Sequence, residues 1–248
     1  MSAKSKGSLT RSVINKSVRD ALKIAAHFNW SLPPFAHWSL EQWEQAGPES
    51  DELRECMLGF DVTDFGSGDF ENIGRVLFTV RNGKTSDPRF PKAYAEKLLI
   101  DPEIQRAPAH FHRKKREDII CRHGGNIMVQ LTKATPEGTY SDESFTIQVN
   151  GITRTLTPGT TVRLTPGESL TIPPYTIHQF WAEEGTGWEM EGKRYSLTSE
   201  ISSVSDDWND NVFFEDWGVR FPTIIEDEPR QFYLCHEYPK PKDAKTAE

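Results

Sequence analysis

From about residue 59 onward, the chain is a succession of short apolar or alternating segments separated by turn residues. The clearest turn is Asn150-Gly151, which stands between the alternating runs Phe145–Val149 and Ile152–Leu156. An Asn-Gly pair in this setting is a strong short-range signal of a β-hairpin. Many short strands with few helices between them are typical of an antiparallel sandwich or a jelly-roll barrel. The sequence therefore predicts an all-β fold over most of the chain.

The predicted strands cover the segments that combine apolar alternation with turn residues at both ends. They are Val76–Arg81, Tyr94–Asp101, Ala107–His112, Asp118–Arg122, Ile127–Thr132, Phe145–Val149, Ile152–Leu156, Thr161–Leu164, Ser169–Ile172, Thr176–Ala182, Tyr195–Ser199 and Phe232–His236.

The first part of the chain has a different pattern, with apolar residues at three- and four-residue steps between Val13 and Phe28. This periodicity predicts an amphipathic helix, with Thr10 as its N-cap. A second short helix is predicted after Ser39, which we expect to cap it. We expect residues 10–58 to form a helical arm packed on a barrel of residues 59–238, with disordered tails at 1–9 and 239–248.

Charge and composition exclude several classes of function. The chain has 29 Lys and Arg against 37 Asp and Glu, a net charge of −8, so we expect no nucleic-acid partner. Its longest apolar runs are far shorter than the roughly 20 residues that span a bilayer, and we expect no membrane association. The start shows no secretory signal, and the three cysteines form no CxxC pair. These features predict reduced thiols and a cytoplasmic protein.

The most informative segment for function is His110-Phe111-His112, followed by Glu117. On a strand, side chains alternate, so both imidazoles point to one face and can converge on one cation. Glu117 opens the next predicted strand, and His178 adds a third imidazole after a proline-marked turn. Three imidazoles and a carboxylate suit Mn²⁺, Fe²⁺, Co²⁺, Ni²⁺ or Zn²⁺ and leave positions open for a substrate.

The spacing of these residues resembles the two motifs of the cupin superfamily. His110, His112, Glu117 and Gly124 match the first motif, and the second is matched by Gly167, Pro173 and His178. The resemblance implies a cupin double-stranded β-helix, a jelly-roll barrel that holds a divalent metal on the three His and the Glu. Two turn positions differ, because Ile104 and Tyr175 stand where the cupin motifs usually have glycine.

Longer segments resemble a particular branch of the cupins, the D-lyxose ketol-isomerase family. The resemblance runs through residues 32–43, 94–100, 110–121, 199–211 and 221–230, and covers about residues 10–238. It implies a Mn²⁺-dependent homodimer that interconverts D-lyxose with D-xylulose, and also D-mannose with D-fructose. Two other readings stay open: an Fe²⁺-dependent cupin dioxygenase, and a sugar-binding cupin without enzymatic activity.

An aldose–ketose isomerase also needs a base and cations near the sugar oxygens. We assign the base to Glu215, whose aromatic neighbours in the sequence predict an apolar setting, with Asp216 and Glu200 as the alternatives, and an assisting role to Lys115. The candidates for binding the sugar are Lys97, Glu200, Asp207 and Arg220.

The remaining histidines fit no ligand spacing, and we interpret each of them as structural: His27, His37, His123 and His236.

Overall fold

The computed structural model describes residues 9–242, and the predicted tails lie mostly outside this range. The helices are α1 (Arg11–His27), α2 (Leu40–Gln45) and α3 (Asp51–Glu55), with 3₁₀ turns at η1 (Pro34–His37) and η2 (Pro48–Ser50). The strands are β1 (Gly59–Thr63), β2 (Arg75–Arg81), β3 (Tyr94–Pro102), β4 (His110–His112), β5 (Glu117–His123), β6 (Ile127–Lys133), β7 (Phe145–Val149), β8 (Ile152–Leu156), β9 (Thr160–Leu164), β10 (Ser169–Ile172), β11 (Thr176–Ala182), β12 (Trp188–Met190), β13 (Lys193–Ser203) and β14 (Asn211–Phe213).

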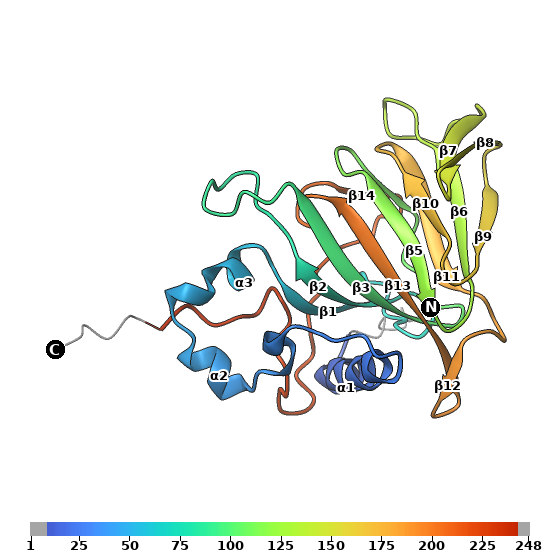
Figure 1. Cartoon of the computed structure of the whole chain (residues 1–248). Helices are drawn as coiled ribbons and strands as arrows, with labels where there is room; N and C mark the ends of the chain where they lie inside the picture. Colours follow the sequence, from blue (N-terminus) through green and yellow to red (C-terminus); the bar gives the residue numbers. More distant parts are fainter. Residues whose placement is uncertain (1–8, 243–248) are drawn as a thin grey trace, which may run out of the picture.

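The strands form two sheets (Figure 1). The larger has nine strands in the order β1-β2-β3-β13-β5-β10-β7-β8, with β12 paired to β13, and the smaller has the order β14-β4-β11-β6-β9. All the pairings between these strands are antiparallel. A buried apolar cluster joins residues of both sheets, among them Leu99 and Ile119 of the larger and Val129 and Phe180 of the smaller. The prediction of a mostly β fold is confirmed.

The helices gather beside β1 and β2 on one side of the larger sheet (Figure 1). Ile14, Val18 and Ile24 of α1 are fully buried in a second apolar cluster that includes Phe60 and Phe78 of the sheet. Thr10 caps α1, because its side chain accepts a hydrogen bond from the backbone N–H of Val13. None of the helices in the described range combines the length and apolar character that crossing a membrane requires.

The local sequence patterns predicted most of the helices and strands. The errors are in segments whose conformation depends on tertiary contacts. Ser39 caps α2, as predicted, and it does so through a capping box with Gln42. The predicted strand at Phe232–His236 is wrong, because this segment makes a backbone bond from Cys235 N to Phe60 O and then turns. Its apolar side chains pack against the α1 cluster instead of alternating across a sheet. Strands β1, β12 and β14 were not predicted, and neither was helix α3.

Ile104 and Tyr175, which stand where the cupin motifs usually have glycine, adopt a backbone conformation that favours glycine. Their φ angles are +61° and +57°, in the left-handed region that favours glycine. Such a conformation costs a non-glycine residue roughly 1–2 kcal/mol. Each residue is held by backbone hydrogen bonds, from Ile104 N to Ala182 O and from Tyr175 N to His112 O. The turn geometry is therefore kept although the glycine is absent.

A buried ion-pair network attaches the start of α1 to the end of the chain. The Arg11 guanidinium is fully buried and donates two hydrogen bonds to each of Glu226 and Glu237, over 2.6 to 3.0 Å. Burial opposes ionisation of Glu237, but the hydrogen bonds from Arg11 outweigh it and hold the pKa of Glu237 below its ordinary value. The hydrogen bond from Arg11 likewise lowers the pKa of Glu226.

We expect Arg11→Met to lower the free energy of unfolding by about 2 kcal/mol at pH 7, because it removes charged hydrogen bonds to Glu237 and leaves this carboxylate with Arg230 and the backbone N–H of Leu234 as partners. Both glutamates have lowered pKa values in the folded protein, so their contribution is present at neutral pH and is lost on acidification. The difference in the free energy of unfolding between variant and parent should therefore decrease as the pH falls below about 4. Urea unfolding at several pH values measures it. Arg19→Met, an exposed arginine of the same helix, is the control and should cost less than about 1 kcal/mol.

Candidate metal centre and its pocket

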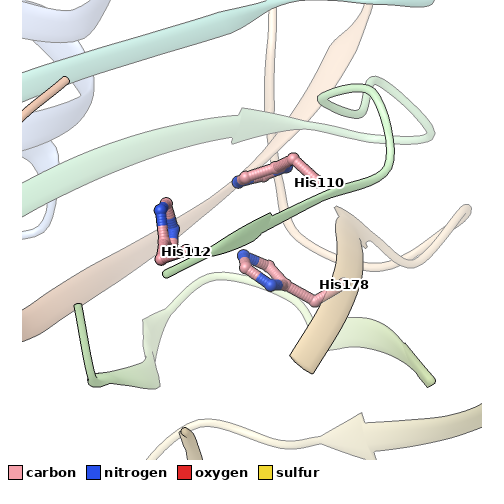
Figure 2. Close-up of side chains that lie close together, drawn as sticks. All are labelled: His110, His112 and His178. Atoms are coloured by element: carbon pink, nitrogen blue, oxygen red, sulfur yellow. The ribbon is translucent and has the colours of Figure 1, made fainter. Parts of the chain in front are cut away.

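Three imidazoles meet on two neighbouring strands of the smaller sheet. His110 and His112 lie on β4, and His178 of β11 pairs directly with His110 across the two strands. One nitrogen from each ring lies within 4.8 Å of the others, and Figure 2 shows the three side chains gathered around one space. Phe111, between the two β4 histidines, is buried in a separate apolar cluster with Ala134. This is the alternation of faces that the HxH spacing predicted.

The hydrogen bonds of two rings fix which nitrogen is left for a ligand. His110 Nδ1 donates to Pro108 O at 2.8 Å, and His178 Nδ1 donates to Thr176 O at 3.0 Å, since a carbonyl oxygen can only accept. With Nδ1 as the donor, Nε2 is the nitrogen of each ring that can bind a cation. Burial, followed by the neighbouring imidazoles, lowers the pKa of His110 well below its ordinary value, which keeps the ring neutral.

Glu117 completes a donor set from the larger sheet. Its Oε1 lies 3.0 Å from His178 Nε2 and 3.6 Å from His112 Nε2. Within the described range, neither Glu117 Oε1 nor either ring nitrogen of His112 has a hydrogen-bond partner, although all are buried. Two ligand atoms about 2.1 Å from one ion and at right angles to each other are about 3.0 Å apart. Neutral nitrogens and a carboxylate oxygen at these separations fit a divalent cation.

The second oxygen of Glu117 belongs to a buried chain of alternating charges. Lys115 Nζ lies 2.6 Å from Glu117 Oε2 and 2.9 Å from Glu200 Oε1. Burial opposes the charge of Lys115, but the two carboxylates outweigh it and raise its pKa. Lys115 therefore stays protonated and holds Glu200 beside the imidazoles.

The chain of charges continues away from the imidazoles. Lys97 Nζ lies 4.0 Å from Glu200 Oε1 and 3.1 Å from Asp207 Oδ1. Arg220 Nη2 lies 3.4 Å from Asp207 Oδ2. Burial opposes ionisation of Asp207, but the charges of Lys97 and Arg220 outweigh it and lower its pKa far below the ordinary value. All of these side chains line one pocket together with the three imidazoles.

The structure does not place Glu215 in this pocket. Glu215 is exposed, lies beyond the end of β14 and is not among the residues that line the cavity. Its backbone carbonyl accepts a hydrogen bond from Gly218 N, so the chain turns there. The apolar setting that we expected for this carboxylate is therefore wrong. Phe213, two residues earlier, does line the pocket and lies against His110.

Sequence reasoning missed Arg75, which also lines the pocket. Its guanidinium pairs with the buried carboxylate of Asp101 and lies 4.1 Å above the ring of Phe180. An arginine at the start of a strand gives no sequence signal of such a position, because its partners come from β3 and β11.

Comparisons with known proteins agree with this architecture. A model of the D-lyxose isomerase family matches residues 9–238. A D-lyxose/D-mannose isomerase of Serratia proteamaculans is 41% identical over 92% of this chain and 96% of its own length. The D-lyxose/D-mannose isomerase of Escherichia coli O157:H7 is 40% identical over 93% of this chain and 98% of its own length.

Solved structures of more distant proteins share the fold. L-ribose isomerase of Cellulomonas parahominis superposes with a TM-score of 0.59, at 15% identity, over 89% of this chain and all of its own. L-ribose isomerase of Acinetobacter sp. DL28 in complex with L-ribose gives 0.58, at 16% identity, over 90% of this chain and all of its own. At this level of identity, the likeness shows a common fold and no more.

Proposed function

The chain belongs to the D-lyxose isomerase family, and from this premise we propose that it interconverts D-lyxose with D-xylulose, and D-mannose with D-fructose, in the buried pocket. The observation that carries the proposal is the meeting of a cation-binding donor set and the buried Lys115–Glu200 pair in one cavity. An aldose–ketose isomerase needs both, since the sugar oxygens must be polarised and a proton must move between C1 and C2.

We propose that His110, His112, Glu117 and His178 hold one divalent cation, with Mn²⁺ as the expected metal. The same donor set also suits Co²⁺, Fe²⁺, Ni²⁺ and Zn²⁺. When bound, the cation supplies Lewis-acid polarisation of the oxygens on C1 and C2 of the sugar. The backbone carbonyls of Pro108 and Thr176 keep two of the rings in the tautomer that this requires.

We assign the base to Glu200 instead of Glu215. Glu200 is buried in the pocket, and Lys115 donates to its Oε1 at 2.9 Å. No side-chain hydrogen bond occupies Glu200 Oε2 in the part of the chain that the structure describes, so this oxygen can accept a proton. It would take the proton from C2 of the aldose as the C2–H electron pair becomes a C1–C2 double bond, the C1=O pair moves onto O1, and the hydroxyl proton of O2 passes to O1. The carboxylic acid would then return its proton to C1, as the electron pair of the double bond forms the new C1–H bond and O2 becomes the carbonyl oxygen. The positive charge of Lys115 would stabilise the oxygen that becomes negative.

The outer part of the pocket supplies polar groups for the remaining hydroxyls. Lys97 donates hydrogen bonds to Ser205 Oγ at 2.7 Å and to Asp207, so the orientation of both partners is fixed before a sugar arrives. Arg220 holds Asp207 from the other side. We propose that Lys97, Asp207 and Arg220 bind the sugar hydroxyls distant from C1 and C2.

We also propose the finer architecture that the cupin motifs imply. The two sheets would be the halves of a cupin barrel over residues 59–238, with residues 10–58 packed on it as an arm. The family resemblance further supports a homodimer. Cys56, Cys121 and Cys235 are free and buried, which suits the reducing cytoplasm.

Incubating the Mn²⁺-loaded protein with D-lyxose under anaerobic conditions should yield a ketose. D-xylose, which differs at C2, is the matched control and should react about 10- to 100-fold more slowly, because one or two mispaired hydrogen bonds cost that much. Chromatography of the products measures both rates. Faster turnover of D-xylose or of a sugar phosphate would contradict the substrate assignment, and a requirement for oxygen would favour the dioxygenase reading.

A further inference from the structure

A second group of ligand-type side chains lies outside the donor set of the three imidazoles. Asp61 of β1, together with Cys235 and His236 of the C-terminal segment, brings a carboxylate oxygen, a thiol sulfur and a ring nitrogen within 4.8 Å of one another. Asp61 is 1% exposed and Cys235 is 5% exposed. The backbone bond from Cys235 N to Phe60 O at 2.8 Å places the two segments side by side.

Two buried polar atoms of this group lack hydrogen-bond partners. Among the described residues, neither Asp61 Oδ1 nor His236 Nδ1 has a hydrogen bond, whereas Asp61 Oδ2 is paired with the guanidinium of Arg220. The ring of His236 lies against Phe221, with centroids 4.6 Å apart, and its Nδ1 lies 3.8 Å from Asp61 Oδ1. Two electron-pair donors therefore face each other across a short gap beside a thiol. A buried arrangement of this kind is unfavourable unless a cation or a proton lies between the donors.

We propose that Asp61, Cys235 and His236 form a second cation site, which takes a thiophilic divalent metal of the Zn²⁺ class. Thiolate, imidazole and carboxylate are the donors that Zn²⁺ prefers, whereas Mn²⁺ favours oxygen. Ligand atoms of a tetrahedral zinc ion are about 3.4–3.6 Å apart, so separations of up to 4.8 Å between the donor atoms need to shorten by about 1.4 Å at most. The thiol proton would pass to solvent as the metal binds.

The charges around the group are compatible with a bound cation. Arg220 Nη1 forms an ion pair with Asp61 Oδ2, while Oδ1 faces His236. Asp207 contacts the same guanidinium and offsets its charge. A divalent cation would then be balanced by the Asp61 carboxylate and the Cys235 thiolate. Asp61 would bridge the metal to Arg220, and so connect this site with the wall of the sugar pocket.

Cobalt provides a test that separates this site from the first one, because a thiolate bound to Co²⁺ gives an intense charge-transfer band in the near-ultraviolet and imidazole or carboxylate ligands do not. The metal-free protein is titrated with Co²⁺ alone. We expect two Co²⁺ per chain and the thiolate band. Cys235→Ser should lose the band and one equivalent of Co²⁺. Cys121→Ser, which alters a buried free thiol that donates to Gly125 O, is the matched control and should keep both.

The outcome does not depend on the sugar isomerase activity. His178→Ala should lose the other equivalent of Co²⁺ and keep the charge-transfer band, which distinguishes failure of one site from failure of the other. Absence of the band from the parent protein would overturn the proposal whether or not the Cys235 variant folds. A band that survives Cys235→Ser would overturn it as well.

Discussion

Replacing His178 by alanine should remove both the bound metal and the isomerase activity. His178 Nε2 lies 3.0 Å from Glu117 Oε1, and Thr176 O holds the ring so that Nε2 faces the other proposed ligands. Removing a residue that only orients a metal ligand costs about 10- to 100-fold in metal affinity, and removal of a ligand should cost more than that. Activity with D-lyxose at limiting Mn²⁺ should fall by the same factor.

Elemental analysis after dialysis, together with the rate at increasing Mn²⁺, measures this effect. The control is His123→Ala, which removes an exposed imidazole from β5 of the larger sheet and should leave metal content and rate unchanged. The fold should survive in both variants, because the buried clusters of a chain this long do not need a metal. A His178→Ala protein that keeps a full equivalent of Mn²⁺ would remove this residue from the site.

The parts of the site that could be predicted are those that local geometry determines. His110 and His112 point to the same face because side chains alternate along a strand, and this does not depend on the rest of the fold. The caps at Thr10 and Ser39 are equally local, since each bonds to a backbone N–H three residues later. The pairing of His178 with His110 is a tertiary contact, and only the resemblance to a known motif could anticipate it.

The predicted apolar setting of Glu215 is wrong for a specific physical reason. Phe213 of β14 faces the pocket, and two residues further along a continuing strand Glu215 would face it too. The strand ends at Phe213, however, and the chain turns with a backbone bond from Gly218 N to Glu215 O. Nothing in the local sequence fixes that end, because β14 exists only through its pairing with β4. The position of Glu200 depends likewise on the pairing of β13 with β3 and β5.

Exchanging Glu200 for glutamine should lower the turnover rate by about 10²–10⁴-fold, the usual contribution of a positioned general base. The amide keeps the size of the side chain and can still accept a hydrogen bond from Lys115, but it cannot take a proton from carbon. The effect should fall on kcat, with KM changed little, since the hydroxyl contacts proposed for Lys97, Asp207 and Arg220 remain. Metal content must be measured alongside, because Lys115 also contacts Glu117.

Glu215→Gln is the matched control, because it makes the same chemical change on an exposed side chain outside the pocket, and its rate should stay within a few-fold of the parent. Running the parent in D₂O tests whether the reaction moves a proton, as a base requires, or a hydride. Deuterium in the product shows that the transferred proton exchanges on a protein group, and Glu200→Gln should slow this exchange together with turnover. If Glu200→Gln kept its rate while Glu215→Gln lost it, the pocket would have to reorganise around β14, and the assignment of the base to Glu200 would fall.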